Sequence, residues 1–229
     1  EGSPVYVYAQ DFTVKGGSVG AAHARKVKKV LSLAEKTGAP VIAIFDTAGA
    51  RLDEGVDAIS AYAEMASATA ALSGVVPQVA LVMGQCGGIA AACAEMNDFV
   101  IMSKAGNLFV NGPQVVSAVS GKEVTMETIG GQDACVKSGV AQIVCASDEE
   151  AIASARKLVA MLPVNNMESA EFDATDDMNR VAPELNEIDT VADVRDVIAR
   201  ITDNGDYIEL GADFAASMVT AIAKIGGRT

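Results

Sequence analysis

Two glycine-containing turns, each following an apolar run, are the parts of this sequence best suited to chemistry. The first is "FDTAGARLDEGVDAIS", which begins at the end of the run 41–46, and the second is "MGQCGGIAAACAEMNDFV", residues 83–100. Small residues after a strand let the backbone approach a ligand, and a following helix leaves its first N–H groups unpaired. One N–H from each turn could therefore bind a single oxygen. Such a pair would form an oxyanion hole for the negative charge that develops on a thioester carbonyl.

The other groups in and around these turns have simpler explanations. Glu54 could be a general acid or base, but an acid near a helix start is usually a cap or a dipole partner. His23 could be a base or ligand, but basic neighbours on a surface helix explain it equally well. Asp98, directly before "FVIMS", is expected to make a structural hydrogen bond. Gly87 and Gly88 could serve only tight strand-to-helix packing, and no GxGxxG dinucleotide motif is present.

The cysteines do not favour a metal site. Cys86, Cys93, Cys135 and Cys145 form no CxxC pair, and the chain has one histidine. A structural zinc site is therefore improbable, and we expect no metal. Reduced, buried thiols are the expected state of all four cysteines.

Charge and hydropathy limit the possible partners. The formal net charge is -13, from 30 acids and 17 bases, which argues against nucleic acid or an anionic membrane as a general partner. Any bound phosphate must then be held by local cations. No apolar run approaches the roughly 20 residues of a membrane span, and no basic and apolar leader stands at the start. We therefore expect a soluble, cytoplasmic protein.

The elements that must position the two turns alternate between strands and helices, which predicts an α/β core with buried strands. A chain of 229 residues, half of them hydrophobic, can bury a sizeable core. The first helix is expected to end at Gly38, and a later helix to begin at a cap formed by Ser147 and Asp148. The predicted strands lie within 4–14, 39–46, 76–84, 98–103, 107–112 and 138–147, and the predicted helices within 16–38, 57–74, 88–96 and 147–162.

Composition divides the chain into three parts. Residues 1–162 carry the alternating pattern and are expected to form one domain. Residues 163–190 are acidic and aperiodic with two prolines, which is typical of a linker. Residues 191–229 resume with a helix, an Asn204–Gly205 turn, a short strand and a further apolar stretch.

Three motifs add a resemblance to a known family. "AQDFTVKGGSVGAAH", "DTAGARLDEGV" and "MGQCGGIAAACAEMNDF" resemble the carboxyltransferase subunits of biotin-dependent acyl-CoA carboxylases and of sodium-pumping acyl-CoA decarboxylases. The resemblance continues through "LFVNGPQVV" and "DNGDYIEL", so it covers essentially the whole chain as an N-terminal half. It implies an α/β fold of the crotonase type, in which ββα units stack as a spiral.

The resemblance also implies substrates and partners. Acyl-CoA would lie between this half and the C-terminal carboxyltransferase half of a partner subunit, in a homo- or hetero-oligomer. That second half would stand on another polypeptide or on a longer chain. The other implied partners are a biotin carboxyl carrier protein and either a biotin carboxylase or a membrane decarboxylase subunit. In the implied mechanism carboxybiotin releases CO2, the biotin nitrogen removes the acyl α-proton, and the thioester enolate attacks CO2.

Carried over by position, the family's catalytic glycine pair falls on Gly88 and Ile89. Their N–H groups are the implied donors, with Ala50 possible from the facing turn. Either the backbone at Ile89 is ordinary or the donor has moved to Gly87, because a β-branched residue resists positive φ. Arg51 could hold CoA phosphates or only pin its turn. The implied substrate-binding residues are Gly49, Arg51, Cys86, Ala90 and Gly112.

Two other functions stay open. An acyl-CoA hydratase or isomerase of the same fold needs a carboxylate at the acyl α and β carbons, whereas residues 89–92 are Ile-Ala-Ala-Ala and Glu95 lies nearly two turns on. A non-catalytic assembly subunit of a carboxylase complex would keep the fold without the chemistry. The family's tyrosine, serine and proline are replaced here by Ala92, Cys93 and Ala94. The identity of the acyl group therefore cannot be carried over from the family.

Overall fold

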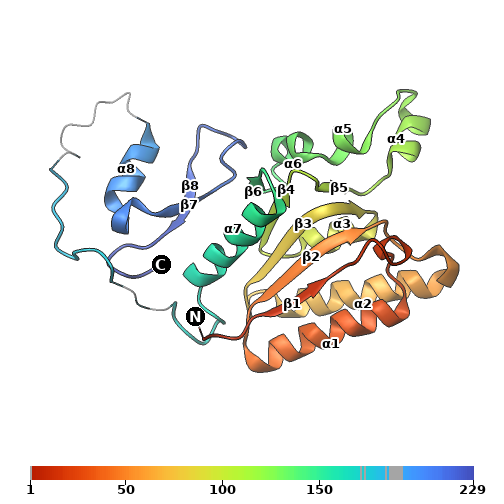
Figure 1. Cartoon of the computed structure of the whole chain (residues 1–229), viewed down its shortest axis with the longest axis horizontal. Helices are drawn as coiled ribbons and strands as arrows, with labels where there is room; N and C mark the ends of the chain where they lie inside the picture. Colours follow the sequence, from red (N-terminus) through yellow and green to blue (C-terminus); the bar gives the residue numbers. More distant parts are fainter. Residues whose placement is uncertain (1, 171, 173, 184, 186–192) are drawn as a thin grey trace.

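A parallel β-sheet with helices on both faces forms the main body (Figure 1). The computed structural model describes residues 2–170, 172, 174–183, 185 and 193–229. The strand order is β1-β2-β3-β4-β6, and β5 pairs with β3 beside this path. The strands are β1 Tyr6–Ala9, β2 Val41–Thr47, β3 Gln78–Gly87, β4 Phe99–Ser103, β5 Asn107–Phe109 and β6 Ile143–Cys145.

Strand β3 is the longest strand of this sheet. On the side away from β2 it pairs with two strands in succession. Its residues 79–82 pair with β4, and its residues 85–87 pair with β5. The end of β3 is therefore held by a different strand from its beginning. This pairing fixes the backbone that leads into the second glycine turn.

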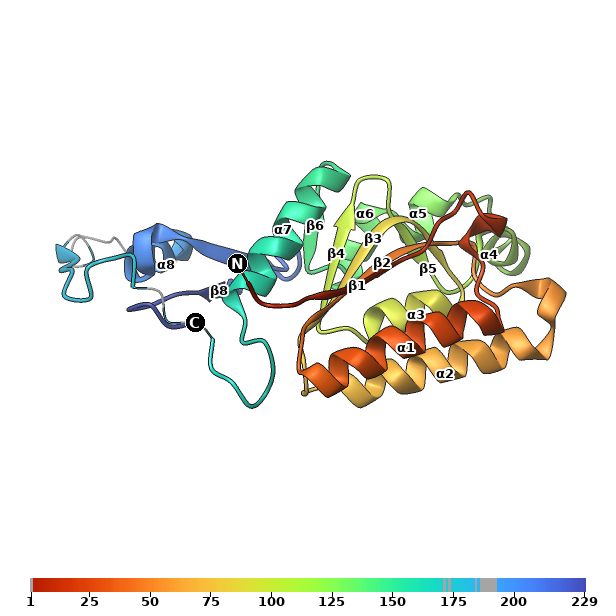
Figure 2. The same cartoon turned by 60° about the horizontal axis from the view of Figure 1, so that its bottom comes forward.

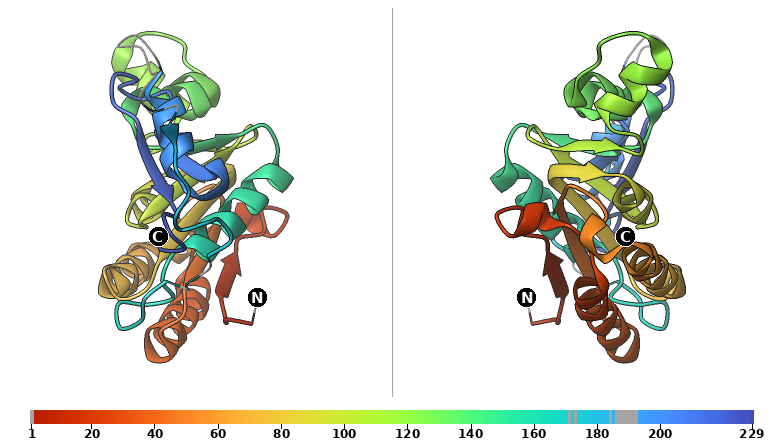
Figure 3. Two further views of the ribbon diagram at one scale, coloured as in Figure 1. Left: turned by 90° about the vertical axis from the view of Figure 1, so that its left-hand side faces the viewer. Right: turned by 90° about the vertical axis from the view of Figure 1, so that its right-hand side faces the viewer.

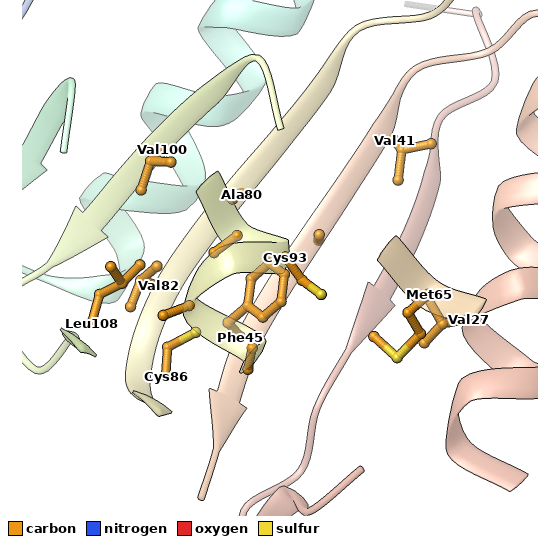
Figure 4. Packing of buried hydrophobic residues seen from close by; sticks show 14 of the residues in the cluster. Val27, Val41, Phe45, Met65, Ala80, Val82, Cys86, Cys93, Val100 and Leu108 are labelled. Carbon is orange, nitrogen blue, oxygen red and sulfur yellow. The ribbon is translucent and has the colours of Figure 1, made fainter. Parts of the chain in front are cut away.

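Helices cover the two faces of the sheet unequally. α1 (Ala21–Thr37), α2 (Val56–Leu72) and α3 (Ile89–Glu95) lie on one face, and α7 (Asp148–Met161) lies on the other (Figure 2). Side chains alternate along β2, so Phe45 is buried with the first group while Ile42 and Ile44 pack towards α7. Figure 4 shows Phe45 close to Cys93 of α3, within the larger of the two hydrophobic clusters.

The helix ends expected from sequence are confirmed. Gly38 follows α1 with φ 63°, a left-handed conformation that glycine adopts without strain. Ser147 precedes α7, and its hydroxyl accepts the Glu150 N–H at 3.2 Å. Asp98 makes the expected structural hydrogen bond, because its carboxylate accepts the Gln78 N–H at 2.8 Å.

Three short helices between β5 and β6 were not predicted from sequence. They are α4 (Pro113–Ser120), α5 (Met126–Gly130) and α6 (Gln132–Ser138). Figure 3 shows this green segment at the opposite end from α1 and α2. α4 buries none of its residues and leaves Val115 and Val119 exposed. A helix of eight residues is shorter than the stretch over which hydrophobic periodicity can be recognised.

The C-terminal residues form a helix and a hairpin. α8 (Val194–Ile201) precedes the antiparallel pair β7 (Tyr207–Leu210) and β8 (Thr220–Ala223). Asn204 adopts φ 54° in the predicted turn. Ile208 and Ile222 pack against the cluster that includes α7.

The division of the chain into residues 1–162, 163–190 and 191–229 stays a prediction. The described residues of 163–185 contain no α-helix or β-strand. The predicted boundary at 190/191 lies outside the described residues, as do residues 1, 171, 173, 184 and 186–192.

Candidate active site

The first glycine turn begins at Thr47, where β2 ends. The Thr47 hydroxyl accepts the Gly49 N–H at 3.1 Å, and the Ala48 N–H donates to Gly16 O at 2.8 Å. Val19 bridges the far side of the turn, since its N–H donates to Gly49 O at 2.9 Å. Ala50 N–H has no acceptor among the residues that the structure describes. The turn therefore leaves the Ala50 N–H free, at the position expected for a donor from this side.

Arg51 and Glu54 hold this turn in place through side-chain hydrogen bonds. Arg51 donates to Ser18 O at 2.8 Å, to Ser18 Oγ at 3.3 Å and to Glu54 Oε1 at 3.2 Å. The other Glu54 oxygen accepts the Ala21 N–H at 2.7 Å, at the start of α1. That N–H, and next the Arg51 charge, hold the pKa of Glu54 below its usual range.

Two sequence interpretations are decided by these contacts. Glu54 caps a helix, but the helix is α1 and not α2, which follows it in the sequence; its carboxylate is held by Ala21 and Arg51. Each of the three Arg51 guanidinium nitrogens has a protein acceptor, which fits the interpretation that this arginine pins its turn. Phosphate binding by Arg51 gains no support from this geometry.

The second glycine turn joins β3 to α3. Gly88 has φ 70° and ψ -137°, a conformation that L-residues rarely adopt, and it precedes the first residue of α3. Its N–H donates to Phe109 O at 3.0 Å and so continues the pairing between β3 and β5. The sequence predicted Gly88 as an N–H donor to the substrate, but in the structure this N–H is already bound to Phe109 O of β5.

Free donors on this side come one residue later. Ile89 and Ala90 are the first two residues of α3, and their N–H groups have no acceptor among the described residues. Ala91 is the first residue of this helix whose N–H is paired, to Gly88 O at 3.1 Å. Ile89 has no positive φ, so the backbone there is ordinary. Of the two alternatives left by the sequence, the structure therefore favours a donor at Ile89.

The two turns lie against each other at the carboxyl ends of neighbouring parallel strands, where β2 and β3 end (Figure 1). Thr47 pairs with Cys86, and the Asp46 carboxylate accepts the Gln85 N–H at 3.2 Å. A Cβ placed on Gly49 would lie 3.2 Å from Gly87 O. The backbones of the two turns are thus in contact at Gly49 and Gly87.

Cys86 and Gly112, two of the expected substrate-binding residues, lie in different surroundings. Cys86 is fully buried in the core (Figure 4), and burial raises the pKa of its thiol. Its side chain is therefore unavailable to a ligand. Gly112 precedes α4, on the segment that follows β5. The pKa values of the other three cysteine thiols are also raised by burial, and all four thiols are free, as expected.

A cavity of about 920 Å³ opens beside the first turn, between β1 and α1. Its wall includes Gly17, Ser18 and Arg51 from the turn region and Gln10 from the end of β1. Four basic or titratable residues of α1 line it further along: His23, Arg25, Lys26 and Lys29.

His23 differs from the surface residue that its basic neighbours suggested. It is half-buried, and its ring lies 3.5 Å from the Gln10 side chain. Burial lowers the pKa of His23, and the positive charges of Arg51 and Lys26 lower it further. The imidazole is therefore neutral at pH 7, and the fixed positive charge of this wall comes from arginine and lysine.

The described part of the chain holds neither a candidate metal site nor a candidate membrane span. No group of three or more His, Cys, Asp or Glu side chains there could hold a metal ion. Among the helices of the same residues, none has the length and hydropathy needed to cross a membrane.

Comparison with known proteins now places the chain in a family. A family model described as "Carboxyl transferase domain" matches residues 1–229. The chain belongs to the carboxyl transferase domain family. This confirms the resemblance drawn from the three motifs.

Named relatives match over the whole chain. It is 42% identical to the methylmalonyl-CoA carboxyltransferase 12S subunit of Propionibacterium freudenreichii subsp. shermanii, covering 100% of this chain and 45% of that protein. It is 39% identical to the methylmalonyl-CoA decarboxylase subunit alpha of Propionigenium modestum and 40% identical to the propionyl-CoA carboxylase beta chain of Roseobacter denitrificans, covering 100% of this chain and 46% of each. The chain thus spans less than half the length of these relatives.

A solved structure agrees with the fold. The crystal structure of the transcarboxylase 12S hexamer, with hydrolysed methylmalonyl-coenzyme A bound, superposes with a TM-score of 0.92 at 42% identity. The match covers 97% of this chain and 45% of that one. The predicted α/β fold of the crotonase type is confirmed at this level.

Proposed function

We propose that this chain is the acyl-CoA-binding half of a biotin-dependent carboxyltransferase. The observation that carries the proposal is the pair of touching turns with free N–H groups at Ala50, Ile89 and Ala90. We assign the thioester carbonyl oxygen of the acyl-CoA to these donors, one turn on each side. Negative charge builds on that oxygen when the α-proton leaves, so fixed N–H donors stabilise the enolate more than the ground state.

Two of the possible general bases beside the turns are not free, which fits a reaction whose base comes with the carboxyl donor. Among the described residues near the turns, Glu54 is occupied as a helix cap and Cys86 is buried. Carboxybiotin, when its carrier delivers it, supplies the carboxyl group and the base. The chain's own residues bind the acyl-CoA, orient its α-carbon and stabilise the enolate oxygen.

The same observation disfavours a hydratase or isomerase. Those reactions need a carboxylate at the acyl chain, and the start of α3 carries Ile89 and three alanines. Glu95, the first acid of α3, is the last residue of that helix and lies on its exposed side. Assembly without catalysis would leave the free donors of both turns without a purpose.

We assign the phosphates of coenzyme A to the α1 wall of the cavity beside the first turn. Arg25, Lys26 and Lys29 place fixed positive charge there, on a chain whose formal net charge is -13. Ser18 and Arg51 line the same cavity and also form part of the first turn's support. The cavity therefore adjoins the support of the first turn, and we assign the two ends of one ligand to these two places.

The partners we propose follow from the length of the relatives. A C-terminal carboxyltransferase half would receive carboxybiotin from a biotin carboxyl carrier protein, within an oligomer. A biotin carboxylase would drive carboxylation, and a membrane decarboxylase subunit would drive the reverse reaction. Four free cysteines suit a reducing compartment, so we place the protein in the cytoplasm, alone or at the surface of such a membrane complex.

Binding and turnover test this proposal separately. Isothermal titration of the chain with acetyl-, propionyl- and methylmalonyl-CoA should show binding of at least one thioester, with free coenzyme A as the control ligand. The chain alone, given free biotin and malonyl-CoA, should release no CO2 above background, whereas addition of the C-terminal half should restore release. Absence of any acyl-CoA binding, or robust turnover by the chain alone, would contradict the two-half arrangement.

A further inference from the structure

Strand β3 carries a bulge shortly before the second glycine turn. β2 and β3 pair in regular register up to Phe45 and Val82, and pairing resumes at Thr47 and Cys86. Between these two pairs β2 has one residue, Asp46, whereas β3 has three. An insertion of this kind bends the strand that carries it, and such bulges are common beside active sites. The bulge therefore sets how the end of β3 lies relative to the end of β2.

The Asp46 side chain occupies this bulge. Its carboxylate accepts the Gln85 N–H at 3.2 Å, so that a side-chain bond crosses the interrupted part of the ladder. A Cβ placed on Gly84 would overlap the same carboxylate. Because φ at Gly84 is not positive, the contact with Asp46 and not the backbone conformation favours glycine there. Two residues of the bulge are thus fitted to one side chain.

Asp46 is itself held in place from β1 and from the loop that follows β1. The buried side chain of Gln10 accepts the Asp46 N–H at 3.2 Å, and the Gln10 N–H donates to Ile44 O at 3.1 Å. A Cβ placed on Gly17 would overlap Asp46 O, so the loop after β1 packs closely against this residue. The backbone that presents the carboxylate to β3 is therefore fixed by its own contacts.

We propose that Asp46 is a positioning residue, whose carboxylate fixes the bulge of β3 and with it the offset between the two glycine turns. Ala50 and Ile89 each come three residues after the pair Thr47 and Cys86, at which regular pairing resumes. If the bulge relaxes, the end of β3 moves relative to β2, and the two N–H groups move apart or together. A misplacement of about 1 Å can cost roughly 10² in rate. This consequence rests on the proposed function, in which both N–H groups are enolate donors.

Amide hydrogen exchange tests the bond in the bulge without any activity assay. Asp46→Ala should speed exchange of the Gln85 amide roughly tenfold, because that N–H loses its acceptor. Asp46→Asn keeps an oxygen on a side chain of the same length and should preserve slow exchange. The matched control is Asp98→Ala, since the Asp98 carboxylate accepts the Gln78 N–H at 2.8 Å at the other end of β3. It should speed exchange at Gln78 and leave exchange at Gln85 unchanged.

Turnover in the complete carboxyltransferase measures the consequence for catalysis. Asp46→Ala should lower kcat roughly tenfold with little change in the KM for acyl-CoA, as expected when transition-state stabilisation is lost, and Asp46→Asn should stay within about threefold of the parent. Asp98→Ala should leave kcat unchanged, although it too removes a carboxylate-to-backbone bond from β3. Gly84→Ala should slow the parent but have little further effect on Asp46→Ala, because both changes act through one contact.

Two outcomes would overturn the positioning role directly. Unchanged Gln85 exchange in Asp46→Ala would mean that the carboxylate does not hold the bulge. An equal loss of kcat in Asp46→Ala and Asp98→Ala would mean that any weakening of β3 slows the enzyme.

Faster Gln85 exchange with unchanged kcat separates this proposal from the proposed function, once Ile89→Pro is measured in the same assay. If Ile89→Pro slows turnover, the donor assignment stands and the positioning role of Asp46 is overturned. If Ile89→Pro does not slow turnover, the donor assignment in the proposed function is overturned, whereas the exchange result upholds Asp46 as the residue that fixes the bulge.

Discussion

Replacing Ile89 by proline is the sharpest test of the donor at the second turn. Ile89 is the first residue of α3, and proline is favoured at the first position of a helix, where its missing N–H costs no helical bond. The variant therefore deletes one free donor while the helix start is kept. Gly88→Pro would be a poorer test, because φ there is 70° and the Gly88 N–H pairs with Phe109 O. Proline holds φ near -65° and would break both features.

The expected loss follows from the role of the donor. Removing one backbone or side-chain donor from an oxyanion hole typically lowers kcat by about 10² to 10³, or about 3 kcal/mol of barrier. Stability should change far less, since proline suits this position and Ile89 is 43% exposed. Ile89→Ala is the matched control: it shortens the same side chain and keeps the N–H. We expect its kcat to stay within about fivefold of the parent, as the donor is retained.

Three measurements decide the outcome for Ile89→Pro. Carboxyl transfer is followed in the complex reconstituted with the C-terminal half, acyl-CoA affinity by calorimetry, and folding by thermal melting. The expected result is a large fall in kcat, a small change in affinity and a melting temperature near that of Ile89→Ala. A folded proline variant that turns over as fast as Ile89→Ala would refute the assignment and move the donor to Ala90.

Three further predictions address the supports of the site. Gly49→Ala should lower the melting temperature, since φ is 106° and the new Cβ would lie 3.2 Å from Gly87 O, a strain of roughly 1–3 kcal/mol; an unchanged melt would contradict this. Glu54→Gln should lower the melting temperature at pH 7, because a carboxylate with a depressed pKa contributes its full stability above its unfolded pKa of about 4.3; the difference should shrink below that pH and vanish once the pH lies below the lowered pKa of the folded state, and an equal difference at every pH would refute it. Lys26→Glu should weaken acyl-CoA binding roughly tenfold at low salt, whereas Lys36→Glu, on the same helix but outside the cavity wall, should not; equal effects would point to the net charge instead.

Local rules were enough to predict most of the fold. The ends of α1 and α7 depend on a glycine in the left-handed region and on a serine cap, which are properties of a few adjacent residues. The central strands are continuous apolar runs, typical of a parallel sheet covered on both faces. Helices α4 to α6 escaped prediction because each spans eight residues or fewer and ends at a glycine, which is too short for hydrophobic periodicity to be recognised.

The candidate site was predictable to the level of its turns but not of its individual donors. Whether an N–H is free depends on which distant group accepts it. The Gly88 N–H is engaged by Phe109 O of β5, and this acceptor cannot be read from the turn's own residues. The same holds for Arg51, whose partner Ser18 lies 33 positions away. Long-range hydrogen bonds therefore determine which of the candidate groups are free, and the local sequence does not reveal them.

The isoleucine at position 89 shows why a departure from the family's glycine pair can leave the chemistry intact. The unusual backbone conformation falls on Gly88, which has φ 70°, and the next residue begins an ordinary helix. A β-branched side chain is compatible with that helical start, so the N–H of Ile89 remains where a glycine would present it. Its side chain is exposed, as are those of Leu52 and Val56 beside the first turn. An acyl-CoA held between the turns would then meet apolar groups around its thioester, where exclusion of water strengthens the hydrogen bonds to the enolate oxygen.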